Sequence, residues 1–390
     1  MESFALSKTS NFKDIESAFE TLEEHKNLRL RLPNTLQERG VFGLEGLVCQ
    51  LLATWLRNNE GENLLHTYTD KITDEAFEDI SSNFYGICAL RLSDRVLSNS
   101  EKIEIPKEIA LSKAFERVRN VLSGNYKDAY KGLYVAIPSI KSSGVNKEYN
   151  NPFYNQGAVI GKSAFRKLTD DILSVVVPQP KRDSFIEGIK VHVSEIVREL
   201  FDNTHKHGRE NESGDILPTN FRGVIYNSVD VTPERLEKLV KSGTQGMALF
   251  SGDWKAWMDK NQRNFPVLDV TVVDAGPGYA RRWTGKNKND LKFEDEISSI
   301  IECFTKNKST SPNIADGSGL THVLTDLRKL RGWFRLRTGS VSVSRSFFNG
   351  DGSVDISRKD INKEGIFVEG VSFNIVIPLV DITKEGITNV

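Results

Sequence analysis

Three short stretches of this sequence carry residue types that could act on a nucleotide. The first is Asp274-Ala-Gly276-Pro-Gly278, which closes an almost continuous apolar run. An aspartate at the end of a strand can accept a hydrogen bond from an exocyclic amine such as that of adenine. Glycines just after it can take positive φ and let the backbone come close to a ligand. Taken alone, however, the same pattern is more typical of a plain turn.

The second stretch is a glycine-rich loop followed by an amphipathic helical pattern. It reads Asp316-Gly317-Ser318-Gly319-Leu320. Backbone N–H groups of such a loop, together with the N-terminus of the helix behind it, form an anion site suited to phosphates. A flexible loop with an ordinary N-cap is an equally good interpretation of this motif on its own.

The third stretch lies near the end of a long helix expected over residues 184–208. Glu199 and Asn203 are four residues apart and share a helical face, and Lys206 follows three residues later. A carboxylate could polarise a water, an amide oxygen could ligate Mg²⁺ and a lysine could meet phosphate oxygens. The alternative is a solvated helix face whose final basic residues suit the helix dipole.

The elements that must position these stretches follow from hydrophobic periodicity. The long helix places one apolar stripe on a helical period: Ile189, Val193, Ile196, Val197, Leu200 and Phe201. The expected elements of this half are helices at 163–177, 184–208, 232–242, 294–304 and 320–330, and strands at 221–227, 267–274, 332–338, 340–347 and 371–379. Strands outnumber crossover helices, which favours an α/β (α+β sandwich) fold with a mixed, largely antiparallel sheet covered on one face by helices.

The first part of the chain alternates between short strand and helix patterns. The first stretch of about 30 residues is rich in charge and is expected to be helical or partly disordered. After it, the expected strands are 28–32, 64–68 and 133–138, and the expected helices are 44–56, 74–97 and 110–122. This alternation predicts a small α/β domain. A polar, Gly/Asn-rich stretch at 141–157 marks the boundary. We therefore expect an N-terminal sensing or interaction domain over 1–145 and a second domain over 158–382.

Composition limits the classes of partner. The chain has 52 basic and 53 acidic residues, so bulk charge does not attract it to nucleic acid or anionic membranes. Its three cysteines are far apart, which argues against a disulfide framework or a structural zinc site. The start lacks the apolar region of a signal peptide, and no segment has the roughly 18 apolar residues of a membrane span. We expect a cytoplasmic protein with no membrane or nucleic-acid partner.

Together, the three stretches resemble the N, G1 and G2 boxes of the GHKL superfamily, the histidine-kinase-like ATPases with a Bergerat fold. The resemblance covers roughly residues 160–380 and implies an ATP–Mg²⁺ site beneath a mobile lid at about 305–319. It assigns roles to the following residues: Asn203 as Mg²⁺ ligand, Asp274 at the adenine amine, Gly276 and Gly278 at the base pocket, Gly317, Ser318, Gly319 and Leu320 at the phosphates, Glu199 as general base, and Lys206 as the lysine of kinase-like members.

The sequence also departs from the family pattern. The G3 box usually begins Gly-Thr, whereas here Val371 follows Gly370. Ser372 is the residue that could supply the missing hydroxyl to the nucleotide. The interval from Asn203 to Asp274 is longer than a minimal domain needs, so an insertion is expected at about 228–262.

Two other signals are set aside. The stretch QGAVIGKS at 156–163 resembles a phosphate loop, but its glycine spacing is one residue too short and no apolar strand precedes it. His192 precedes Glu195 on the long helix, where a phospho-acceptor is not expected because sensor kinases carry theirs on a separate dimerisation domain. We expect His192 to be a partly buried histidine whose hydrogen-bonding groups are satisfied.

The leading functional hypothesis is an ATP-hydrolysing conformational switch, with Glu199 assisting hydrolysis and the N-terminal domain or another subunit sensing lid closure. One alternative is a Ser/Thr protein kinase of the anti-sigma type, because the N-terminal pattern loosely resembles the STAS-like partners of such kinases. Another is a non-hydrolysing ATP-gated interaction module in a stress or phage-defence system. Self-association or a protein partner is expected in each case.

Overall fold

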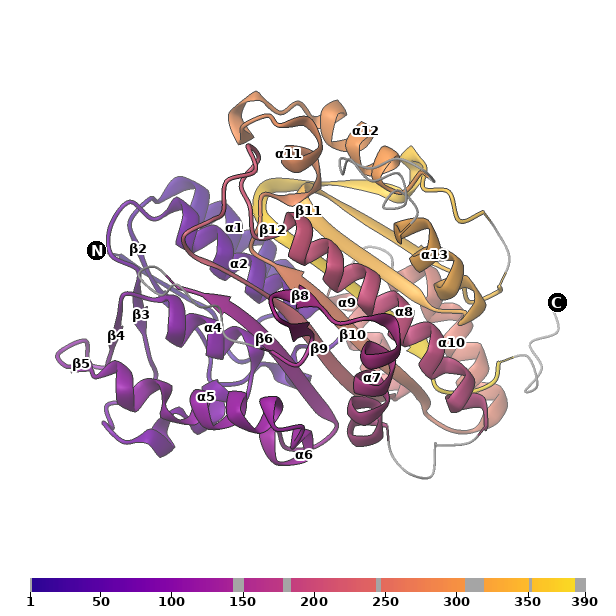
Figure 1. The fold of residues 1–390 in the computed structure, drawn as a ribbon, viewed down its shortest axis with the longest axis horizontal. Helices are drawn as coiled ribbons and strands as arrows, with labels where there is room; N and C mark the ends of the chain where they lie inside the picture. Colours follow the sequence, from indigo (N-terminus) through magenta and orange to yellow (C-terminus); the bar gives the residue numbers. More distant parts are fainter. Residues whose placement is uncertain are drawn as a thin grey trace.

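The computed structural model describes residues 2–142, 151–177, 184–242, 247–305, 319–350 and 353–382 of the 390-residue chain. Two five-stranded sheets organise these residues, with helices between and around them (Figure 1). The fold is mixed α/β, as the sequence predicts.

The first sheet is built by the N-terminal part of the chain, in the order β1-β2-β3-β4-β5. Its first four strands are parallel neighbours, and β5 pairs antiparallel with β4. The strands are β1 (Glu2–Ala5), β2 (Leu28–Arg31), β3 (Leu64–His66), β4 (Arg95–Leu97) and β5 (Glu104–Ile105). The helices are α1 (Phe12–Glu24), α2 (Leu44–Asn58), α3 (Glu78–Ser81), α4 (Phe84–Leu92), α5 (Lys107–Leu122) and α6 (Tyr126–Ala129). The alternating pattern is therefore confirmed, but the helical stretch expected to reach residue 97 ends at Leu92, and β4 follows it.

The second sheet has the order β11-β12-β10-β9-β6, and every neighbouring pair is antiparallel. Its strands are β6 (Tyr134–Lys141), β9 (Asn220–Val231), β10 (Phe265–Asp274), β11 (Trp333–Ser346) and β12 (Ile361–Pro378). The two strands expected at 332–338 and 340–347 form the single strand β11, with a register shift at Gly339. β6, which the sequence placed in the N-terminal domain, is the edge strand of this sheet. A separate two-stranded hairpin joins β7 (Tyr154–Asn155) to β8 (Ala158–Val159).

The helices of the C-terminal part are α7 (Lys162–Val176), α8 (Ser184–His207), α9 (Pro233–Lys241), α10 (Met247–Asn261), α11 (Gly278–Thr284), α12 (Phe293–Cys303) and α13 (Gly319–Lys329). Helices α7 and α8 pack on one face of the second sheet, and α13 lies beside α8 (Figure 1). We call this the outer face. The apolar stripe predicted for α8 is buried along it.

The opposite face of the second sheet is covered by α1, α2 and α4, and we call it the inner face. This corrects the expectation of helices on one face only. Every residue of α2 from Leu44 to Trp55 is buried. The reason is that α2 lies between the sheets: Trp55 donates its indole N–H to the carbonyl of Leu28 in β2 at 2.8 Å, while Gly46 packs against Ser372 of β12. Apolar residues of both halves join in one continuous core.

The segment expected to be an insertion, at about 228–262, holds α9 and α10 between β9 and β10. Its aromatic side chains Trp254 and Trp257 pack against Phe265 in tilted and edge-on arrangements and form a second, smaller apolar cluster. Phe42, from the loop before α2, completes this cluster. Across the described ranges, we find no helix that combines the length and the apolarity needed to cross a membrane.

Candidate functional site

A pocket opens on the outer face where the C-terminal part of α8 meets the end of β10 and the middle of β12. It encloses about 860 Å³ of empty space, part of it open to solvent. Its walls come from α8, β10, α11, the end of α12, the start of α13 and β12. The lining residues are Leu200, Asn203, Thr204, His207, Gly208, Val272, Asp274, Gly278, Tyr279, Arg282, Trp283, Cys303, Gly319, Leu320, Val371 and Phe373.

Asp274 is the last residue of β10, and its side chain lines this pocket although only 6% of the residue is exposed. One carboxylate oxygen accepts the backbone N–H of Gly276 at 2.9 Å, and the backbone N–H of Val371 also interacts with the carboxylate. Burial raises its pKa to about 7, against the opposing effects of the Gly276 N–H and the Arg222 and Arg57 guanidinium groups. Asp274 therefore faces the pocket with unused acceptor capacity.

Glycines let the backbone of α8 touch the loop that follows Asp274. Gly208 comes directly after α8, and a Cβ atom there would lie 2.6 Å from Cγ of Asp274. A Cβ atom on Gly276 would lie 2.6 Å from Cα of Gly208. Gly278 has φ +80°, and a Cβ atom there would lie 2.7 Å from Oγ1 of Thr338. The glycines thus let this loop pack closely against the residue that follows α8 and against β11, whereas the close approach to a ligand stays a prediction.

One face of α8 lines the pocket through Leu200, Asn203, Thr204 and His207. Their spacing of three and four residues is that of a single helical face. The side chain of Asn203 is half-buried and makes no hydrogen bond to any residue that the structure describes. Its amide oxygen is therefore placed to ligate a cation or a ligand group in the pocket.

Glu199 and Lys206 lie beside the pocket and do not line it. The Glu199 carboxylate lies against Gly319, where a Cβ atom would be 2.9 Å from Oε2, and it pairs with Arg198 on the same helix. Lys206 is turned toward Asp202, with its ammonium 2.9 Å from the carboxylate. The structure thus brings Glu199 to the start of α13 but leaves Lys206 outside the pocket wall.

Gly319 and Leu320, at the start of α13, line the pocket opposite α8. The predicted phosphate residues Gly317 and Ser318, and nearly all of the predicted lid at 305–319, lie outside the described residues. The described part therefore shows one edge of the expected phosphate region, the N-terminus of α13.

The expectation for Ser372 is corrected by the register of β12. Val371 and Phe373 line the pocket, so the residue between them faces the other side of the sheet. Ser372 pairs with Val273, and its hydroxyl lies against Gly46 of α2. It therefore belongs to the inner face and does not supply a hydroxyl to the pocket.

The sequence interpretation missed the wall formed by α11. Tyr279, Arg282 and Trp283 all line the pocket. Arg282 donates to a Glu210 carboxylate oxygen at 2.8 Å, and the Trp283 indole N–H donates to Glu302 at 2.8 Å. The signal was the spacing of these three residues by three and four positions directly after the glycine motif, which is one face of a short helix.

The inner face carries a hydrogen-bonded connection to the back of the same pocket. Arg57, near the C-terminal end of α2, donates to the carbonyl of Ala275 at 2.7 Å. Gln50, two turns earlier, donates to the carbonyl of Gly370 at 3.3 Å. Gly370 in turn donates its N–H to the carbonyl of Gly276 at 2.8 Å. Helix α2 of the N-terminal part therefore contacts the loop after Asp274 from the inner face of the sheet.

Comparison of the chain with family models, with curated proteins and with solved structures gives no match in any of the three.

Proposed function

We propose that this protein binds ATP with Mg²⁺ in the outer-face pocket, as a Bergerat-type domain of the GHKL superfamily. The observation that carries the proposal is the convergence of three distant segments. Asn203, Asp274 and Gly319, which belong to the three stretches singled out in the sequence, all line one pocket.

The chemistry of the walls suits each part of the nucleotide. Leu200, Val272 and Phe373 offer apolar surfaces for a base, and Asp274 offers an acceptor for its exocyclic amine. Asn203 would ligate Mg²⁺ through its amide oxygen. The phosphates would lie toward Gly319, because the N-terminus of a helix attracts anions.

Glu199 is our candidate for the general base of hydrolysis. Its carboxylate lies next to Gly319, at the phosphate end of the proposed nucleotide, and about a quarter of its side chain is exposed. It can therefore reach a water there while Asn203, one turn later on α8, holds the metal. Lys206 is not assigned a role because it is paired with Asp202.

Binding of a nucleotide at Asp274 would also affect the contacts of α2 on the inner face. The Ala275 carbonyl that follows Asp274 is held by Arg57 of α2, so a shift of this loop acts directly on the helix between the two sheets. This contact supports the proposal that the N-terminal part senses nucleotide binding and that the protein acts as a switch.

The test is a calorimetric titration of the full chain with ATP–Mg²⁺, ADP–Mg²⁺ and GTP–Mg²⁺. We expect ATP to bind more tightly than GTP, whose carbonyl would face the Asp274 carboxylate where adenine presents an amine. Asp274→Asn should weaken ATP binding about 10- to 100-fold, because a hydrogen bond to a charged group contributes about 1.5–3 kcal/mol. Asp269→Asn, on the same strand but the inner face, is the matched control and should bind as the wild type does.

Unchanged ATP affinity in Asp274→Asn, with intact folding by circular dichroism, rules the adenine assignment out. Labelled ATP then separates the uses of the phosphate. Free phosphate that depends on Glu199 indicates an ATPase, stable label on protein indicates a kinase, and tight binding without turnover indicates a binding module. Full turnover by Glu199→Ala removes Glu199 as the base.

A further inference from the structure

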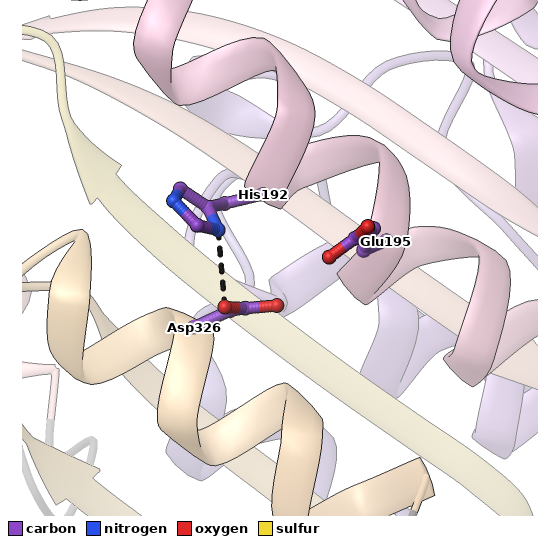
Figure 2. Close-up of side chains that lie close together, drawn as sticks. All are labelled: His192, Glu195 and Asp326. Carbon is purple, nitrogen blue, oxygen red and sulfur yellow. Dashed lines mark ion pairs between the residues drawn. The ribbon is translucent and has the colours of Figure 1, made fainter.

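A second group of potential ligands lies on the outer face, away from the pocket. His192 and Glu195 are three residues apart on α8, and Asp326 comes from α13. One ligand atom from each lies within 4.8 Å of the others. Figure 2 shows the three side chains projecting into the seam between the two helices.

The contact between His192 and Asp326 is close but is not a hydrogen bond. Nδ1 of His192 lies 3.0 Å from a carboxylate oxygen of Asp326, the pair joined by the dashed line in Figure 2. Yet Nδ1 is buried and has no hydrogen-bond partner in the described part of the chain. The two atoms are close, but their geometry does not make a hydrogen bond between them. This is the arrangement expected of two ligands of one ion. Ligands of a tetrahedral Zn²⁺ are about 3.3–3.6 Å apart, given metal–ligand distances of about 2.0–2.2 Å, so a small adjustment of the two side chains would seat an ion.

We propose that His192, Glu195 and Asp326 form a binding site for a divalent transition-metal ion of the Zn²⁺ type. Imidazole favours such ions over Mg²⁺ or Ca²⁺, and two carboxylates supply the negative charge. Three protein ligands leave a further position for water. The site is independent of the ATP–Mg²⁺ proposal, because none of its residues lines the pocket.

Burial and mobility of the three groups suit metal capture. Asp326 is fixed, with a side chain only 9% exposed, and the oxygen that faces His192 also accepts a hydrogen bond from the ammonium of Lys329 at 2.9 Å. That ammonium is on a side chain 54% exposed and can turn away when a cation replaces its charge. Glu195 is exposed, so it can rotate onto an ion held by the other two groups.

The position of the site gives the ion a structural effect. Helices α8 and α13 run antiparallel, because Glu199 meets Gly319 and, seven residues away on each helix, His192 meets Asp326. A bound ion would cross-link the helices about 10 Å along the axis from the start of α13. It would therefore restrain Gly319 at the pocket edge; that consequence, unlike metal binding itself, rests on the proposed nucleotide site.

The test is Zn²⁺ binding to the full chain without nucleotide, by competition with a chromophoric chelator. We expect one Zn²⁺ per chain, and Co²⁺ should give visible absorption bands of a four-coordinate site. Glu195→Gln and His192→Ala should each weaken binding at least about tenfold, since even residues that only support metal ligands change affinity by about 10- to 100-fold. His322→Ala, which alters an exposed histidine of α13, is the matched control and should bind normally.

Glu195→Gln changes an exposed side chain, so its effect does not depend on an altered fold. Binding by Glu195→Gln and His192→Ala equal to that of the wild type overturns the proposal, as does a wild type that takes up no Zn²⁺ at micromolar concentration. Asp274→Asn should keep full Zn²⁺ affinity, which separates this proposal from that of the nucleotide site.

Discussion

Buried carboxylates on the two faces of the second sheet differ in their hydrogen-bond partners. On the inner face, Asp269 of β10 accepts the N–H of Phe42 at 2.6 Å and the amide of Asn374 at 2.5 Å. Glu45 of α2 accepts the N–H of Phe84 at 2.7 Å and contacts a tyrosine hydroxyl. On the outer face, the carboxylate of Asp274 of the same strand interacts with the backbone N–H groups of Gly276 and Val371 and with no side-chain hydrogen-bond donor among the described residues.

Alternation along β10 explains how one strand serves both faces. Asp269 and Asp274 are five positions apart, so their side chains point to opposite sides of the sheet. Buried polar groups in a packed interior are normally hydrogen-bonded, and the two carboxylates of the inner face follow this rule. A buried carboxylate that retains acceptor capacity beside an open pocket is instead suited to a ligand. The comparison therefore separates two structural acids from the acid that we propose binds the ligand.

The largest expected effect concerns Glu45. Burial raises its pKa to about 8, against the hydrogen bonds from Phe84 and Tyr134. Because the folded pKa exceeds the unfolded value, its stabilising contribution is complete below about pH 4.5 and is lost as the pH rises toward 8. Glu45→Gln keeps the neutral form at every pH. The difference between variant and wild type should therefore grow by about 4 kcal/mol in favour of the variant between pH 5 and pH 9.

Urea unfolding across this pH range measures that difference. Glu108→Gln, which changes an exposed glutamate of α5, is the control and should follow the wild-type profile. If the free energy of unfolding of Glu45→Gln changed with pH in parallel with that of the wild type, Glu45 would not be a buried neutral acid. The contrast between the two faces would then rest on Asp269 and Asp274 alone.

A smaller effect is expected from two glycines of the α8 region. Gly208→Ala places a Cβ atom 2.6 Å from Cγ of Asp274, so the pocket must open and the free energy of unfolding should fall by about 1–3 kcal/mol. Gly188→Ala, within α8 and with no atom near the new Cβ, should stabilise the protein by up to about 1 kcal/mol. Thermal and urea unfolding distinguish the two. Equal effects of both changes would mean that α8 does not rest on the Asp274 loop.

The sequence predicted the elements that have a strong period of their own. The α8 helix begins and ends as expected, and its apolar stripe is buried. The motifs around Asn203, Asp274 and Gly319 also meet at one pocket, although the separate motifs did not require it. Local patterning placed each motif at the end of a regular element, but only the family resemblance implied that the three motifs share one site.

The sequence could not give information that depends on strand partners. The apolar run of β6 indicates burial, but it does not say which sheet receives the strand. The side of Ser372 depends on its register with Val273, a long-range pairing that periodicity does not contain. For the same reason, the cover that α2 gives to the inner face and the contact of Arg57 with Ala275 could not be foreseen.

The smallest expected effect is the release of a proton from Asp274 when a nucleotide binds. Since burial raises its pKa to about 7, about half of the Asp274 side chains are protonated at pH 7. A donor such as the adenine amine favours the ionised form, so binding of ADP–Mg²⁺ at pH 7 should release up to about half a proton, and less at pH 8. Calorimetry in buffers of different ionisation enthalpy measures this number. Asp269→Asn should release the same amount, because Asp269 faces α2. Buffer-independent enthalpies at pH 7 would mean that the ligand does not meet the Asp274 carboxylate, and the acid of the outer face would then be as structural as those of the inner face.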